Sequence, residues 1–95
     1  MPTYTVLADA DEAQFQNPQE LVSIWGGIRE DIDRLGGELE DSYALVGGHD
    51  FMLTFEVDEE DAALQIALAI EGRGLDTETL RSIPIDRMGD LVEDV

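Results

Sequence analysis

The sequence predicts a single α+β domain, in which a four-stranded antiparallel sheet carries two helices on one face. Three observations lead to this fold class. The chain has 95 residues, enough to enclose one core but not two, so residues 1–95 are expected to form one domain. Apolar residues alternate with the period of a strand in four segments and recur with the period of a helix in two others. These segments follow one another as β-α-β-β-α-β, which is the split βαβ or ferredoxin-like order.

The first strand and the first helix come from the N-terminal third of the chain. Thr3 to Asp9 alternates and is rich in β-branched and aromatic residues, which is typical of a strand. The helix is predicted to begin with Asn17 as its N-cap, Pro18 at its first position and Glu20 in the capping-box position. Its apolar residues share one helix face, and they are Leu21, Ile24, Trp25, Ile28, Ile32 and Leu35.

The same helix has a polar face and two internal glycines. We expect two i, i+4 ion pairs on the polar face, Arg29 with Asp33 and Glu30 with Arg34. Gly26-Gly27 costs about 1 kcal/mol per glycine relative to alanine. The pair therefore indicates either a tolerated weak point or a close approach by another backbone.

The second and third strands form a predicted hairpin. Leu39 to Val46 and Asp50 to Val57 both alternate, and Gly47-Gly48-His49 between them has the composition of a turn. One face of the second strand is expected to carry Leu39, Tyr43 and Leu45, and the other Ser42, Ala44 and Val46. The third strand aligns four apolar residues on one face, Phe51, Leu53, Phe55 and Val57.

The remaining third supplies the second helix, the last strand and a tail. The acidic run Asp58-Glu59-Glu60-Asp61 is predicted to cap a helix that Ala62 to Ile70 fills with apolar residues. Asp76 to Ile85 predicts a fourth strand, which is broken at Pro84. Asp86 to Val95 predicts a short amphipathic helix.

The sheet face away from the helices is predicted to be too apolar to face water. It is expected to carry Thr5, Leu7, Ala44, Val46, Met52 and Thr54. A solvated sheet surface is normally more polar, above all in a strongly charged chain. We therefore expect a second copy to pack on this face about a twofold axis, giving a homodimer with a small cavity between the sheets.

The charge of the chain excludes several classes of partner. Lys and Arg number 5 against 23 Asp and Glu, so the net charge is −18. Such a surface repels nucleic-acid phosphates and anionic membranes. Distributed acids and the absence of lysine indicate a halophilic protein that works in molar salt, where the Debye length is about 3 Å. The N-terminal apolar stretch is too short for a signal peptide or a membrane span, so a cytoplasmic location is expected.

Few residues carry recognisable chemistry. The chain has no cysteine and a single histidine, so no Cys-ligated or multi-His metal centre and no cofactor are expected. His49, beside Asp50, is either a solvated turn residue or a general base oriented by a carboxylate. Trp25 is expected to belong to the core. The candidate ligand-binding residues, each with an alternative role in the sheet, are Leu7, Tyr43, Met52, Thr54 and Arg81.

Several segments of the chain resemble the GYD domain family. They are Met1 to Leu7, Gly47 to Phe51, the alanine-rich second helix and Thr77 to Pro84. In place of the Gly-Tyr-Asp motif this chain has Gly48-His49-Asp50, so histidine replaces the tyrosine. The resemblance implies a ferredoxin-like domain of the dimeric α+β barrel type, here an acidic member of haloarchaeal type, and it implies no particular reaction.

Three functions are compatible with these residues. The first is a homodimeric small-molecule-binding protein with its ligand between the sheets. The second is a cofactor-independent enzyme, monooxygenase-like or isomerase-like by fold analogy, in which His49 or Tyr43 handles a proton. The third is a regulatory module whose sheet is covered by a different protein. The sequence leaves open whether the protein is an enzyme.

Overall fold

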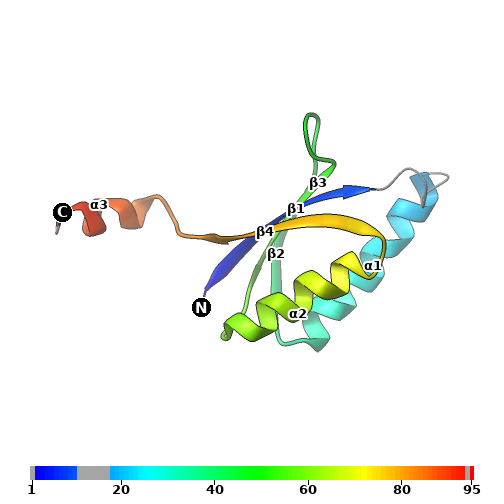
Figure 1. Ribbon diagram of the computed structural model, residues 1–95, viewed down its shortest axis with the longest axis horizontal. Coiled ribbons are helices and arrows are strands. Elements are labelled where there is room, and N and C mark those ends of the chain that lie inside the picture. The colour runs from blue at the N-terminus through cyan, green and yellow to red at the C-terminus, as the bar shows by residue number, and fades with distance from the viewer. Residues whose placement is uncertain (1, 11–17, 94) are drawn as a thin grey trace.

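The computed structural model describes residues 2–10, 18–93 and 95, and it confirms the predicted order of elements (Figure 1). The predicted N-cap Asn17 lies outside the described residues. The elements are β1 (Thr3–Ala10), α1 (Pro18–Arg34), β2 (Glu38–Ala44), β3 (Phe51–Glu56), α2 (Glu60–Glu71), β4 (Leu75–Ser82) and α3 (Asp86–Val92).

The four strands form one antiparallel sheet in the order β2-β3-β1-β4. The helices α1 and α2 lie side by side on the same face of this sheet (Figure 1). The fold is therefore the predicted ferredoxin-like one, and the sheet has a face covered by helices and an open face.

The core lies between the sheet and the two helices. Tyr4, Val6 and Ala8 of β1 are buried, while Thr5 and Leu7 between them point to the open face, as the alternation predicts. The largest fully buried side chains come from β3 and both helices, and they include Phe55, Leu53, Ile28, Ile32, Ile66 and Ile70. Burying each contributes about 1.5 to 3 kcal/mol of transfer free energy.

The register of β2 corrects the predicted faces of this strand. Leu39 pairs with Phe55, but the next partner along, Thr54, pairs with Asp41, so Glu40 is an extra residue in a β-bulge. One extra residue inverts the alternation of everything that follows. Tyr43 therefore lies on the open face, opposite Met52.

The same bulge removes Ala44 and Val46 from the open face, where the alternation placed them. Ala44 pairs with Phe51 on the helix-covered face. Val46 follows the end of β2 and is fully exposed in the turn.

The ends of the helices differ from the prediction at one point. Glu59 is the N-cap of α2, but its side chain makes no capping hydrogen bond. The acids Glu60 and Asp61 in the first turn act instead through their charge at the positive end of the helix dipole. Gly36 after α1 and Gly74 after α2 have φ of 87° and 95°, a conformation that favours glycine.

A buried carboxylate, that of Asp31, joins the two helices. Its Oδ2 accepts a hydrogen bond of 2.7 Å from Nε of Arg73, which follows α2, and its Oδ1 accepts one of 3.3 Å from Arg34. The hydrogen bond from Arg73 lowers the pKa of Asp31 below its ordinary 3.8. A depressed folded-state pKa adds stability above the unfolded-state pKa, and this stability is lost as the pH falls through the folded-state pKa.

These contacts replace the two ion pairs expected on α1. Arg34 pairs with Asp31 rather than with Glu30. Arg29 forms no ion pair with Asp33 or with any other described residue. The i, i+4 spacing identifies charged residues that are neighbours on the helix. It does not identify Asp31 as the carboxylate that both Arg34 and the distant Arg73 contact.

The two glycines of α1 have different surroundings. A Cβ on Gly27 would overlap the guanidinium of Arg73, whereas a Cβ on Gly26 would meet nothing within 4 Å. Gly27 thus permits a close approach, by a side chain rather than a backbone. Gly26 is a tolerated weak point.

We predict opposite effects for alanine at these two positions. Gly26→Ala should raise the free energy of unfolding by about 1 kcal/mol, because it removes a helix-interior glycine into open space. Gly27→Ala should lower it by about 1 kcal/mol, because displacing Arg73 costs the charge-assisted hydrogen bond to Asp31 more than the helix gains. Urea unfolding in molar KCl measures both, and equal stabilisation by the two variants would contradict a structural role for Arg73.

The chain beyond β4 leaves the body of the domain. Residues 83–93, here called the C-terminal arm, extend away from the sheet and contain α3 (Figure 1). The amphipathic helix is confirmed, over Asp86–Val92, and none of its residues is buried. Every large apolar side chain of the arm is exposed, namely Ile83, Ile85, Met88, Leu91 and Val92.

Candidate functional site

The open face of the sheet has an apolar centre, which we call the apolar band. Met52 lies between its pairing partners Leu7 and Tyr43, and Leu80 pairs with Thr5 in the next row. Leu7 and Met52 are half-buried by their neighbours, while Tyr43 is 53% and Leu80 43% exposed. No element of the described chain packs over these four side chains.

The structure brings together four of the five predicted ligand-binding residues. Leu7, Tyr43, Met52 and Thr54 all lie on the open face, on three adjacent strands. Arg81 does not join them. It pairs with Tyr4 on the other face of the sheet, and its guanidinium lies 5.8 Å from the centre of the Tyr4 ring.

A polar groove of about 350 Å³ adjoins the apolar band at one end of the open face. Its walls are mainly hydroxyl and carboxylate groups, from Thr3, Thr5, Glu40, Asp41, Thr54, Glu56 and Ser82, with Ile83 and Pro84 at the start of the arm. Thr5 Oγ1 and Ser82 Oγ share a hydrogen bond of 2.5 Å, and the backbone N–H of Asp41 donates to Thr54 Oγ1 over 3.2 Å.

Two carboxyl groups meet in this groove. The pKa of Glu40 is raised above its ordinary 4.5, chiefly because its carboxyl group hydrogen-bonds to that of Glu56. Such a bond requires a proton, so it weakens when both groups ionise. The bulge at Glu40 thus leaves a carboxylate repulsion on the open face at neutral pH.

The predicted catalytic pair, His49 and Asp50, lies where the β2–β3 turn meets the end of β1. The carboxylate that contacts His49 is that of Asp9, not Asp50, with 3.0 Å between Nδ1 and Oδ2. Since an ionised carboxylate only accepts hydrogen bonds, Nδ1 is the donor, and a neutral ring then has its lone pair on Nε2. Asp9 was missed because 40 residues separate it from His49.

Asp50 itself fastens the turn to β1. Its carboxylate accepts a hydrogen bond of 3.0 Å from the backbone N–H of Ala10, and its own N–H donates to Asp9 Oδ1 over 3.0 Å. The Asp50 side chain therefore satisfies a backbone donor at the end of a strand. It does not orient the imidazole.

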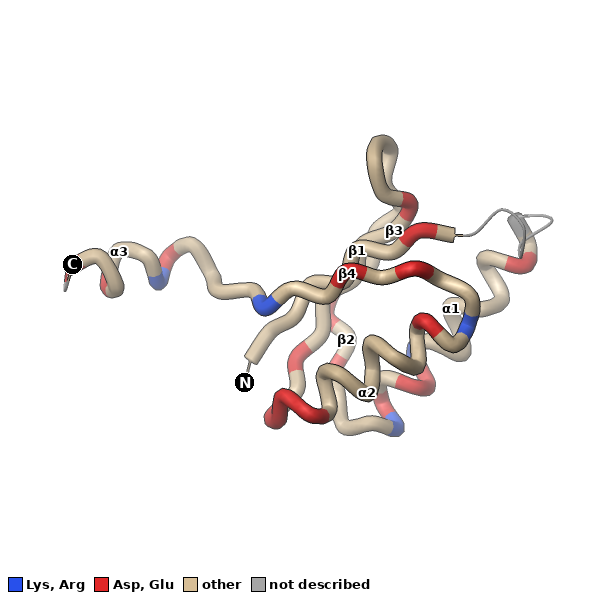
Figure 2. Tube along the Cα trace, in the orientation of Figure 1, with Lys and Arg blue, Asp and Glu red and all other residues tan. Residues whose placement is uncertain are grey.

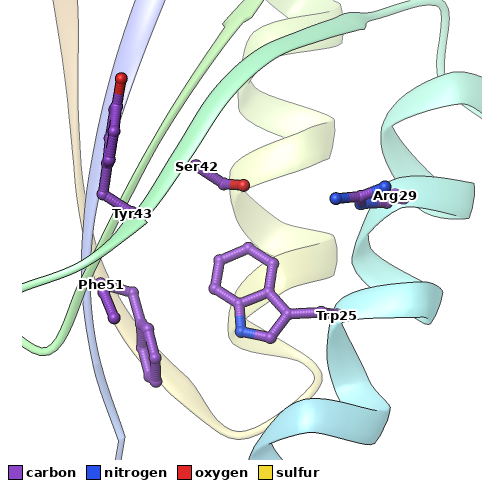
Figure 3. A pocket seen from close by; sticks show the side chains of 6 residues that line it. Trp25, Arg29, Ser42, Tyr43 and Phe51 are labelled. Carbon is purple, nitrogen blue, oxygen red and sulfur yellow. The ribbon is translucent and has the colours of Figure 1, made fainter.

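A second hollow lies on the helix-covered side, between α1 and β2 (Figure 3). We call it the α1–β2 pocket; its volume is about 180 Å³, and it is lined by Trp25, Arg29, Ser42, Tyr43, Ala44 and Phe51. The rings of Trp25 and Phe51 meet edge to face, with 5.4 Å between their centroids. Trp25, predicted to be a core residue, is half-buried and forms one wall.

Sequence reasoning missed this pocket. Trp25 and Arg29 are an i, i+4 pair and so share a helix face, but Arg29 had been assigned to a surface ion pair. Ser42 and Ala44 reach the pocket because of the bulge at Glu40. The i, i+4 spacing of Trp25 and Arg29 could have indicated that both line one site. Nothing in the sequence indicates the bulge that brings Ser42 and Ala44 to it.

The described residues contain neither a cluster of metal ligands nor a membrane-spanning helix. Within residues 2–10, 18–93 and 95, no group of three or more His, Asp or Glu side chains is placed to hold a metal ion. In the same residues, no helix is both long and apolar enough to cross a bilayer.

A match to a family model identifies the family of this chain. The model of the GYD domain matches residues 4–92. The chain belongs to the GYD domain family. This match confirms the resemblance inferred from the sequence. In this GYD domain, hydrogen bonds to Asp9 and Ala10 hold the Gly48-His49-Asp50 turn in place.

Solved structures resemble this GYD domain in fold. Six chains match significantly. One is the leucine response regulatory protein of Mycobacterium tuberculosis, with a TM-score of 0.62 and 15% sequence identity over 87% of this chain. The GYD domain spans 51% of that protein, about half its length. No curated protein sequence matches the chain significantly. At this level of identity the likeness concerns the fold alone.

We predict that the Glu40–Glu56 contact makes the domain less stable as the pH rises. Because the folded-state pKa of Glu40 is raised, the contribution of this group is most favourable in acid and is lost as the pH rises through that pKa. Glu40→Gln should therefore raise the urea midpoint at neutral pH, at the lowest KCl concentration that maintains the fold. The gain should disappear in acid. Glu78→Gln, on the opposite edge of the same face, is the charge-matched control, and an equal gain from it would contradict a specific Glu40–Glu56 effect.

Proposed function

We propose that this GYD domain is a homodimeric small-molecule-binding protein that works at high salt. In this proposal two copies pack through their open faces and hold the ligand between the sheets. The single observation that carries it is the apolar band of Leu7, Tyr43, Met52 and Leu80, which nothing in the described chain covers. A second copy is a suitable cover because it presents the same band, so a twofold interface is self-complementary.

The free energy of association makes the C-terminal arm relevant to this proposal. Fully burying a large apolar side chain contributes about 1.5 to 3 kcal/mol, while association costs about 4 to 15 kcal/mol. Two bands together have eight such side chains, which are already partly covered by their neighbours. Burying them thus releases a free energy comparable to the free-energy cost of association. The exposed apolar side chains of the arm, among them Ile85, Met88 and Leu91, would supply the remainder by packing on the partner.

The position of the arm supports the same arrangement. The groove beside the band is lined by Ile83 and Pro84 as well as by Thr5 and Thr54, so the arm begins at the edge of the open face. A copy seated on the open face would lie next to the arm. The threonine and serine hydroxyls of the groove would then line a partly enclosed space, which suits a ligand with both polar and apolar groups.

The charge explains why high salt belongs to the proposal. Acidic residues lie along the edge strands β2 and β4 as well as along α1 and α2 (Figure 2), and each copy carries a net charge of −18. Two such copies repel one another in dilute buffer. In molar salt the Debye length of about 3 Å confines this repulsion to direct contacts.

We predict that the open face controls the molecular mass in molar KCl. The unmodified protein should have twice the mass of the chain by light scattering, and lowering the KCl concentration should shift it toward a monomer. Leu7→Arg should be monomeric because it places a charge in the centre of the interface. Leu64→Arg, on the exposed side of α2, is the matched control and should stay dimeric. A monomeric unmodified protein in molar KCl would contradict the proposal.

The ligand is tested separately from the dimer. A thermal-shift screen of metabolites in molar KCl should give at least one compound that stabilises the unmodified protein, since a ligand that binds only the folded state raises its melting temperature. The shift should be lost in Leu7→Arg and kept in Leu64→Arg. A shift that survives in the monomeric variant would place that ligand elsewhere on the chain.

One observation favours an enzyme as the second candidate. The contact between His49 Nδ1 and Asp9 Oδ2 is the arrangement in which a carboxylate orients an imidazole for proton transfer. The imidazole is 37% exposed and so is accessible. The Asp9 carboxylate also accepts a hydrogen bond from the N–H of Asp50. A carboxylate that only stabilises the turn would make the same contact, so this contact does not favour an enzyme.

A further inference from the structure

We propose that the α1–β2 pocket binds a small organic anion, consisting of one carboxylate on a flat apolar body. This goes beyond the function proposed above, because the pocket lies within one chain, on the helix-covered side of the sheet. It needs no second copy, and Tyr43 is the one lining residue that it shares with the apolar band.

Arg29 contributes the positive charge of the pocket. Carboxylates are abundant in this chain, which has 23 acidic residues and 5 basic ones. Arg34 and Arg73 both pair with Asp31, and Arg81 packs on the Tyr4 ring. The side chain of Arg87, in the exposed C-terminal arm, has no ion-pair partner among the described residues. Arg29 has no hydrogen-bond or ion-pair partner among the described residues. Among the arginines that the described residues leave without an ion pair, Arg29 is the one that lines the α1–β2 pocket.

Two polar groups of the pocket are placed to share one ligand. The guanidinium of Arg29 and the hydroxyl of Ser42 point toward one another from α1 and β2, across the opening of the pocket (Figure 3). A carboxylate between them would accept two parallel N–H bonds from the guanidinium on one side and the hydroxyl on the other. One guanidinium and one hydroxyl match a single carboxylate; no lysine is available to neutralise a polyphosphate.

The interior of the pocket is apolar and aromatic. Below these polar groups the walls are the rings of Trp25 and Phe51, which are half-buried and in edge-to-face contact. An apolar cavity of about 150 Å³ accommodates benzene, so a pocket of about 180 Å³ fits a six-membered ring bearing one carboxylate. Aromatic walls favour a planar body over a branched one.

The chain provides its own reporter for this site, because Trp25 is the single tryptophan. We would titrate benzoate in molar KCl and follow the fluorescence of Trp25 and the NMR resonance of its indole N–H. Benzamide, which has nearly the same shape without the charge, is the ligand control. We expect saturable changes with benzoate and at least tenfold weaker binding of benzamide, since benzamide cannot accept the charge-assisted hydrogen bonds of a carboxylate.

The matched variants are Arg29→Gln and Arg87→Gln. Both remove one positive charge from an exposed side chain, but Arg87 lies in the C-terminal arm. Arg29→Gln should weaken benzoate binding at least tenfold, and Arg87→Gln should leave it unchanged. Equal effects of the two variants, equal binding of benzamide, or an unchanged indole resonance at the solubility limit of benzoate would each overturn the proposal.

The same experiment separates this site from the dimer interface. Leu7→Arg should retain full benzoate binding, and Arg29→Gln should retain the mass of the unmodified protein. Loss of benzoate binding in Leu7→Arg would place the site between two copies and would overturn the assignment to a single chain. If the unmodified protein is monomeric yet binds benzoate through Arg29, the proposed anion site is supported and the proposed dimer is contradicted.

Discussion

The chain has enough helix to cover only one of the two faces of its sheet, and the other properties of the structure follow from this constraint. The helices α1 and α2 lie on one face, where they bury Phe55, Ile28 and Ile66. The hydrogen bond between Asp31 and Arg73 holds the two helices together as a layer. The opposite face is left with leucine, methionine and tyrosine at its centre, a composition that favours burial rather than exposure.

Charge and apolar area act against each other on this open face. The acids keep the protein dissolved and apart from other anionic molecules, yet they also surround the only apolar band that the described strands present to solvent. Screening by salt removes the long-range part of the repulsion and leaves the short-range gain of burying the band. Arg29 differs from the other arginines because it lines a pocket and has no ion-pair partner among the described residues.

The order of the elements and most of the core were predictable because they depend on short-range periodicity. The apolar stripe from Leu21 to Ile32 lies in α1, and Val6 and Phe55 are buried as the alternation requires. The face of Tyr43 was not predictable, because a bulge at Glu40 has no signature in the sequence. The partners of His49 and Asp31, Asp9 and Arg73, lie about 40 residues away. Such contacts exist only once the sheet and the helix layer have formed.

The central claim is that the open faces of two copies touch each other. It is tested most directly by isotope-filtered NMR on a mixture of methyl-labelled and unlabelled chains in molar KCl, which detects only contacts between copies. We expect nuclear Overhauser effects that join the Met52 and Leu7 methyl groups of one copy to open-face side chains of the other. Effects confined to Leu64 and Leu68 on the exposed side of α2, or none between copies, would contradict the account.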